Sequence, residues 1–205
     1  MTSRSVLSGA LLPGCLALTA TVLAFPGGPA PAFTGGFDEL TCASSGCHES
    51  FDLNAGRELG LGDVVISGLP QQYEPGKAYP TTVTVTHIEG RQQWGFQLAA
   101  RVKATGAQAG ELQSVDDYTQ VLVENAIQYV EHTEEGIYTN TFEFTWVAPD
   151  ETVGEVIMHA AGNAADGSVS PDGDYIYGTS VTLAPAGASM RLLPGHAPVW
   201  ARGHE

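Results

Sequence analysis

The sequence predicts an all-β protein folded as an antiparallel, immunoglobulin-like sandwich. Residues 60–183 hold a series of short segments rich in β-branched and aromatic residues, separated by Gly, Pro and Asp turns. Several segments alternate polar and apolar residues, which is the period of a half-buried strand. No helical periodicity persists along this region. Such a pattern is typical of a two-sheet sandwich.

The expected strands follow from local composition. Thr and Val alternate over residues 81–86, and Phe142, Phe144 and Trp146 share one face of another strand. A helix is conceivable only within residues 111–125. The expected strands are, in chain order, residues 64–66, 81–86, 94–102, 127–130, 138–146, 156–160 and 175–183.

The first 32 residues have the features of an export signal. One basic residue, Arg4, precedes a mostly apolar stretch, and Ala30 and Ala32 supply the small residues that a signal peptidase reads. We therefore expect a signal peptide over residues 1–32, cut after Ala32. The alternative is lipidation at Cys15, in a weak lipobox-like stretch. Residues 184–205 contain three prolines and no period, which predicts a flexible tail.

The charge of the chain limits the kinds of molecule that it is expected to bind. Lys and Arg number 8 against 23 Asp and Glu, giving a net charge of -15. Such a surface repels phosphate, so nucleic acid is excluded as an expected partner. Beyond the signal segment we expect no membrane span, because no other stretch is apolar and long enough.

The residues with the clearest chemical signal form the segment Cys42-Ala43-Ser44-Ser45-Gly46-Cys47-His48. Two cysteines followed directly by histidine is the arrangement for covalent haem attachment. Each thiol would form a thioether with one haem vinyl group, and His48 would be an axial iron ligand. The usual spacing leaves two residues between the cysteines, whereas four stand here. The longer loop must bulge outward to keep both sulfurs in place.

Two other interpretations of these residues stay open. Cys42 and Cys47 could form a disulfide, which export favours. The protein would then be a haem-free secreted binding or adhesion module. Alternatively Cys42, Cys47 and His48 could bind zinc, although the mature chain has no further cysteine to complete a thiolate-rich site.

A run of short blocks carries a family resemblance. The blocks are Phe33 to Phe37, Gly68 to Tyr79, Trp94 to Leu98, Ala109 to Gly110, Tyr129 to Thr133, Trp146 to Pro149, Ala160 to Ala165 and Gly173 to Tyr177. Their order resembles exported bacterial proteins with a reelin-type (reeler) β-sandwich, including the group called choice-of-anchor V, many of which carry a cytochrome c-like C-x-x-C-H segment ahead of the sandwich. The resemblance implies a reeler-type sandwich over residues 60–183 preceded by a haem-binding arm at residues 33–59, with one covalent haem c. The present chain departs in its cysteine spacing and in lacking a recognisable C-terminal anchor.

A haem iron held by His48 needs a second ligand or an open position. His132 is the first choice, because it lies at a strand-to-loop junction within one of the resembling blocks. His159 and then Met158 follow, and strand alternation places these two on opposite faces. Two imidazole ligands would make a one-electron carrier rather than an enzyme, whereas an open position would allow small-ligand chemistry.

Several weaker expectations complete the analysis. Asp166, Asp172 and Asp174 lie in a Gly-containing loop that could hold calcium, although the spacing is not that of an EF-hand. The arm could lie on a neighbouring subunit, which would make the protein a homo-oligomer. A redox partner protein is expected, and its identity cannot be read from the residues.

Overall fold

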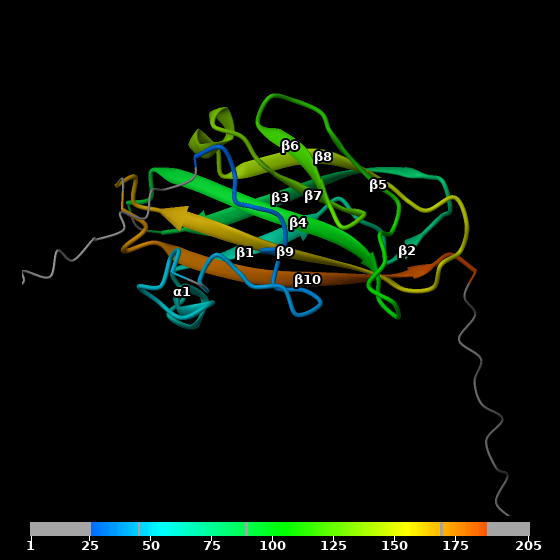
Figure 1. Cartoon of the computed structure of the whole chain (residues 1–205), viewed down its shortest axis with the longest axis horizontal. Helices are drawn as coiled ribbons and strands as arrows, with labels where there is room; N and C mark the ends of the chain where they lie inside the picture. The colour runs from blue at the N-terminus through cyan, green and yellow to red at the C-terminus, as the bar shows by residue number, and fades with distance from the viewer. Residues whose placement is uncertain (1–25, 45, 89, 169, 188–205) are drawn as a thin grey trace, which may run out of the picture.

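The computed structural model describes residues 26–187 except residues 45, 89 and 169. Two β-sheets pack face to face as a sandwich (Figure 1), which confirms the predicted all-β fold. The described strands are β1 (Gly62–Ser67), β2 (Gln72–Tyr73), β3 (Ala78–His87), β4 (Gln93–Val102), β5 (Glu111–Ser114), β6 (Thr119–Glu124), β7 (Ile127–His132), β8 (Thr141–Val147), β9 (Val156–Ala165) and β10 (Tyr175–Pro185). The described helical turns are α1 (Ala55–Glu58) and the 3-10 turn η1 (Glu135–Tyr138).

The two sheets differ in size. The four-stranded sheet has the order β1-β3-β8-β5, and the six-stranded sheet has the order β2-β10-β9-β4-β7-β6. Neighbouring strands are antiparallel except β2, which pairs in parallel with β10. Among the described residues, no helix has the length and apolar character that a membrane span requires.

The core lies between the sheets and is rich in aromatic residues. Phe142, Phe144 and Trp146 of β8 are buried, as predicted, while Glu143 between them is exposed. Phe96 of β4 stacks on Phe142, with ring centroids 4.4 Å apart. Successive side chains of a strand point to opposite faces, so every second residue faces the core between the two sheets.

The other face of β4 is covered too. Gln97 and Ala99 are as buried as Leu98 between them. The covering segment is the N-terminal arm, residues 26–59, drawn blue to cyan in Figure 1, which crosses β4, β9 and β10 on the outside of the six-stranded sheet. Because the arm has no periodicity, the sequence pattern could not predict where it lies.

The expected helix within residues 111–125 is wrong, because this segment forms β5 and β6. Asn125 and Ala126 have φ angles of 50° and 63°, and they join β6 to β7 as a two-residue hairpin turn. The β-branched residues Val121 and Val123 favour the strand. The expected signal segment up to residue 25, Cys15 and the tail from residue 188 lie outside the described residues.

Candidate functional site

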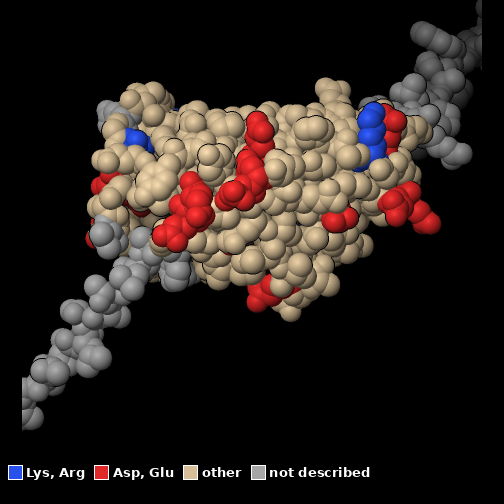
Figure 2. All heavy atoms as spheres, turned by 90° about the horizontal axis from the view of Figure 1, so that it is seen from above, with Lys and Arg blue, Asp and Glu red and all other residues tan. Residues whose placement is uncertain are grey.

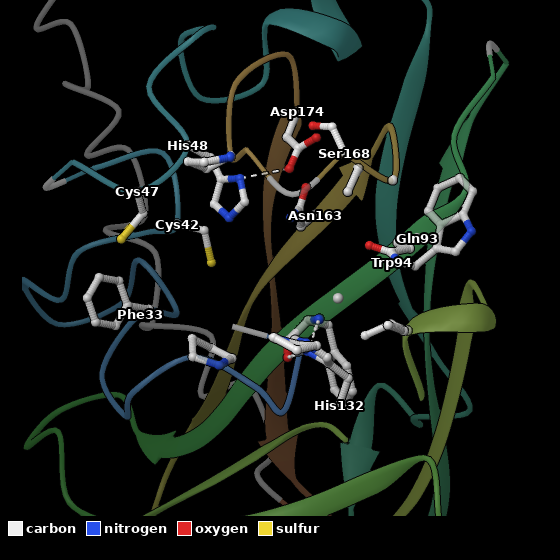
Figure 3. A pocket seen from close by; sticks show the side chains of 18 of the residues that line it. Phe33, Cys42, Cys47, His48, Gln93, Trp94, His132, Asn163, Ser168 and Asp174 are labelled. Carbon is white, nitrogen blue, oxygen red and sulfur yellow. Dashed lines mark hydrogen bonds and ion pairs between the residues drawn. The ribbon is translucent and has the colours of Figure 1, made fainter. Parts of the chain in front are cut away.

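A cavity of about 600 Å³ lies between the N-terminal arm, the strands β4 and β9, and the loop that joins β9 to β10. Its walls are mainly apolar and include Phe33, Trp94 and Phe96. Figure 3 shows Phe33 at one end of the cavity and Trp94 at the other. This size and lining are typical of a site for an organic ligand. The cavity is also lined by four residues that the sequence singled out, namely Cys42, Cys47, His48 and His132.

The cysteine-histidine loop is closed by its own backbone. The His48 N–H donates to the Cys42 carbonyl oxygen at 3.0 Å, which brings the two ends of the loop together. Gly46 has a φ of 75°, a conformation that glycine adopts without strain. Its N–H donates to a Glu49 carboxylate oxygen at 2.6 Å. Gly46 thus lies in a turn, and both cysteines line the cavity.

Cys42 and Cys47 are not bonded to each other in this structure. Burial raises the pKa of the Cys42 thiol to about 12, with a smaller contribution from Cys47. The Cys42–Cys47 disulfide of the alternative interpretation stays a prediction.

His48 ends the loop and points into the cavity. Its Nδ1 lies 2.9 Å from Oδ2 of Asp174, and the two side chains are 18% and 4% exposed. Because Nδ1 faces Asp174, Nε2 is the nitrogen directed into the cavity (Figure 3). An imidazole held in this way can bind iron through that nitrogen.

His132 reaches the cavity from the opposite side (Figure 3). The ladder between β4 and β7 ends at the pair Gln97–Glu131, and the buried imidazole occupies the next position. The Phe96 N–H donates to His132 Nδ1 at 3.1 Å, and the same nitrogen lies 3.2 Å from the Phe96 carbonyl oxygen. These backbone contacts hold the ring in place. Gly95 permits this placement, because a Cβ there would be 2.7 Å from the ring.

The other two ligand candidates do not line the cavity. His159 lies under the arm, where a Cβ on Gly36 would be 2.4 Å from its ring and Phe37 meets it edge-on at 5.7 Å. Burial lowers the pKa of His159, which favours the neutral ring. Met158 is fully buried in the core between the sheets. Of the expected iron ligands, the structure therefore brings His48 and His132 together and separates them from His159 and Met158.

Hydrogen bonds hold the arm to the sandwich both before and after the cysteine-histidine loop. Before it, Glu39 Oε1 accepts hydrogen bonds from Arg101 Nη2 at 2.5 Å and from Tyr129 OH at 2.7 Å. After it, Asn54 Oδ1 accepts one from the Gly178 N–H at 2.8 Å. These contacts are with the chain's own sandwich, and the expected homo-oligomer stays a prediction.

Residues 26–32 form one wall of the cavity. Pro26, Pro29 and Ala30 line it. Gln120 Nε2 donates to the Gly27 oxygen at 2.6 Å, and Gln97 Nε2 donates to the Ala30 oxygen at 2.9 Å. These contacts cover polar side chains on the outside of β4 and β6.

The expected cut after Ala32 conflicts with this wall. Ala32 itself packs against a small apolar cluster of Ala99, Ile127 and Tyr129 on the sheet. Cleavage there would expose that cluster and remove acceptors from Gln97 and other side chains. Buried polar groups that lose their partners cost about 1–3 kcal/mol each.

Glu131 lies beneath the same wall and is 1% exposed. Its two oxygens accept hydrogen bonds from Gln97 Nε2 at 2.8 Å and Gln120 Nε2 at 3.1 Å. Burial outweighs these bonds and raises the pKa of Glu131 from 4.5 to about 7. The folded chain therefore binds this proton more tightly than the unfolded chain does.

Glu131 should make the folded protein less stable as the pH rises. Between about pH 4.5 and 7 the folded state holds a proton that the unfolded state has lost, so the free energy of unfolding falls with pH by up to roughly 3 kcal/mol. Glu131→Gln should lack this fall in the free energy of unfolding. Urea denaturation at pH 5 and pH 8 measures the fall, with Glu134→Gln, at an exposed residue, as the control. Equal pH dependence in Glu131→Gln and the wild type would contradict the account.

The calcium and zinc expectations gain no support. Within residues 26–187, omitting those left undescribed, no group of three or more His, Cys, Asp or Glu side chains is placed to hold a metal ion by itself. Asp166 accepts a hydrogen bond from the Ser168 N–H at 2.7 Å, and Asp172 accepts one from the Ser170 hydroxyl at 2.8 Å. The third loop carboxylate, Asp174, faces His48 instead.

Comparison with known proteins identifies the sandwich. The model of a family described as the reeler domain matches residues 63–163. The sandwich has a reeler-type fold. This match begins after the segment that holds Cys42, Cys47 and His48, so it concerns the β-sandwich and not the cysteine-histidine loop.

Solved structures of reeler domains are similar to the chain. The reeler domain of human F-spondin is 22% identical, with a TM-score of 0.45, over 60% of this chain and 87% of that chain. The Reelin-N domain of F-spondin is 22% identical, with a TM-score of 0.46, over 60% of this chain and 85% of that chain. No curated protein matches the chain.

Sequence reasoning missed two parts of the site. Asp174 was considered only for calcium, because a loop carboxylate carries no signal of the histidine it contacts across the chain. Residues 26–32 were assigned to the signal peptide, because Ala30 and Ala32 match a cleavage pattern. The run of Gly and Pro in that segment could have indicated an ordered, turn-rich wall.

Proposed function

We propose that this reeler-type protein is an exported monohaem c-type protein that carries electrons or forms part of an extracellular assembly. One observation carries the proposal: a single apolar cavity gathers two free thiols and two imidazoles from segments far apart in the sequence. Cys42 and Cys47 come from the arm with His48, whereas His132 comes from the end of β7.

The residues that line the cavity are of the kinds that hold haem c. The Cys42 and Cys47 thiols would each add S–H across a vinyl double bond, which needs no oxidant and releases no leaving group. The imidazoles of His48 and His132 would each supply one ligand to the iron. Phe33, the other aromatic walls and the segment 26–32 would exclude water from the ring faces.

Haem bound in this way supplies an iron that gains and loses one electron. Because His48 and His132 would both bind the iron, we propose a one-electron carrier rather than an enzyme. The protein fixes both imidazoles in advance: Asp174 contacts one, and the Phe96 backbone holds the other. Such fixed ligands favour electron transfer, because little rearrangement accompanies the change in charge.

A redox partner should be positively charged. The chain has a net charge of -15. Described basic side chains such as Arg57, Lys77 and Lys103 are each paired with a carboxylate. Figure 2 shows acidic side chains spread over one face and basic ones in small groups. Complementary charge would steer a basic partner to this surface.

A haem-free binding module is the second candidate. The family match alone fits this reading better, because that match concerns the β-sandwich and calls for no haem. The same apolar cavity would then bind another organic molecule between the arm and β4.

Absorbance separates the two candidates. The full chain should be exported from cells that contain haem-maturation machinery, and then purified. A Soret band that remains with the protein through acid-acetone extraction supports covalent haem. A colourless protein from the same cells contradicts it and leaves the binding module.

We also propose that the protein is exported, to the periplasm, the cell surface or the medium. We propose that the signal peptide is cut after Ala24 rather than after Ala32. Val22 and Ala24 offer small or branched residues at the two positions that a signal peptidase reads, so hydrolysis of the Ala24–Phe25 bond would keep the whole cavity wall.

N-terminal sequencing of the exported protein tests this position. We expect Phe25 as the first residue, followed by Pro26. An N-terminus at Phe33 would show that the wall is removed, and with it the backbone acceptors that Gly27 and Ala30 offer to Gln120 and Gln97. An N-terminus at Cys15 would show lipidation instead.

A further inference from the structure

Asp174 is the most buried of the three carboxylates in the loop between β9 and β10. Its side chain is 4% exposed, and Oδ2 lies 2.9 Å from His48 Nδ1. The other oxygen, Oδ1, accepts a hydrogen bond from the Asp166 N–H at 3.1 Å. A carboxylate in this position costs free energy unless its charge is satisfied, and His48 is the cationic or donating group that faces it.

The loop holds Asp174 in place independently of the cavity. Arg91 Nη1 donates to the Gly173 oxygen at 2.9 Å, and the Ser50 hydroxyl oxygen accepts the Gly173 N–H at 2.8 Å. Asp174 also directly precedes β10, whose ladder with β9 begins at Tyr175. The carboxylate is therefore fixed by the sheet and by the arm, and it presents one oxygen to the back of the His48 ring.

We propose that Asp174 is a positioning residue that orients His48 and lowers the reduction potential of the iron which His48 would bind. This inference rests on the proposed function. A carboxylate behind an imidazole fixes its tautomer and makes the other nitrogen a stronger donor. Its negative charge, in a site sheltered from water, also favours the more positive ferric state over the ferrous state.

The test compares two isosteric variants of the same loop. Asp174→Asn removes the charge, and its amide oxygen can still accept from the Asp166 N–H. Asp172→Asn is the matched control, because Asp172 is exposed and bonds only within the loop to Ser170. The reduction potential of each purified holoprotein is measured by spectroelectrochemistry, together with its thermal stability.

At a fixed applied potential, Asp174→Asn should raise the ratio of ferrous to ferric protein about tenfold, which for one electron is about 59 mV. Asp172→Asn should change the ratio by less than about threefold. Asp174→Glu keeps the charge, should also stay within about threefold, and serves if Asp174→Asn does not fold.

Each outcome decides the matter. If the wild type holds no haem, the proposed function fails and this inference fails with it. If the wild type holds haem but Asp174→Asn changes the ratio no more than Asp172→Asn, the proposed function stands and Asp174 is only structural. If Asp174→Asn does not fold and Asp174→Glu shifts the ratio tenfold, charge is not the cause and the inference is overturned.

Discussion

Replacing both Cys42 and Cys47 with alanine is expected to abolish covalent haem attachment. Each thiol supplies one thioether, so the double variant has no bond that survives denaturation. Haem that resists acid-acetone extraction should fall from nearly all of the bound haem to none. Cys42→Ala alone should keep one thioether through Cys47 and shift the haem absorbance only slightly.

Ser44→Ala is the control for this experiment, because it changes the same loop and removes no sulfur. It should retain wild-type haem content. Retention of acid-resistant haem in the double variant would show that the attachment lies elsewhere. Loss of haem in Ser44→Ala to the same extent would show that the loop conformation, rather than the thiols, is decisive.

Replacing His132 with alanine is expected to open one iron coordination position. Two imidazoles give a strong ligand field, so the wild-type ferric spectrum should be low-spin. In His132→Ala the spectrum should become high-spin, and carbon monoxide should bind the ferrous form readily. The variant should also lose about 1–3 kcal/mol of stability, because the Phe96 backbone loses its imidazole partner.

Two comparisons separate ligation from structural damage in His132→Ala. Added imidazole should restore the low-spin spectrum without restoring the full stability. His159→Ala should leave the spectrum unchanged, because His159 packs on Gly36 outside the cavity. A spin change in His159→Ala alone would assign the ligand to His159. An unchanged spectrum in both variants would place the ligand elsewhere.

The sandwich could be predicted because its signal is local. Alternating residues such as Phe142, Glu143 and Phe144 face opposite sides of a strand whatever the rest of the chain does. The failure at residues 111–125 has a local cause as well. The four-residue edge strand β5 carries little apolar alternation, and the hairpin turn after β6 uses Asn125-Ala126 instead of a glycine-containing pair.

The site could be predicted only in part. The loop of Cys42, Cys47 and His48 is continuous in sequence, so its residues were found together. His132 was a choice among several histidines, and the structure gives it a cavity that His159 lacks. The contact between His48 and Asp174 joins residues far apart in the chain. Contacts of this kind arise from tertiary packing, so a single sequence shows no pattern that would predict them.

The burial of both faces of β4 has the same explanation. An aperiodic arm covers the outer face through a few specific contacts, such as Glu39 with Arg101 and Tyr129. These residues are polar, and composition alone would place them at the surface.

The mass of the intact exported chain tests the central claim most directly. Denaturing mass spectrometry should give the mass of the chain from its measured N-terminus plus one haem, because the thioethers of Cys42 and Cys47 survive denaturation. The same sample should show no signal two hydrogens below the unmodified chain. That deficit without added haem would show a Cys42–Cys47 disulfide, and it would contradict the assignment of this cavity to haem.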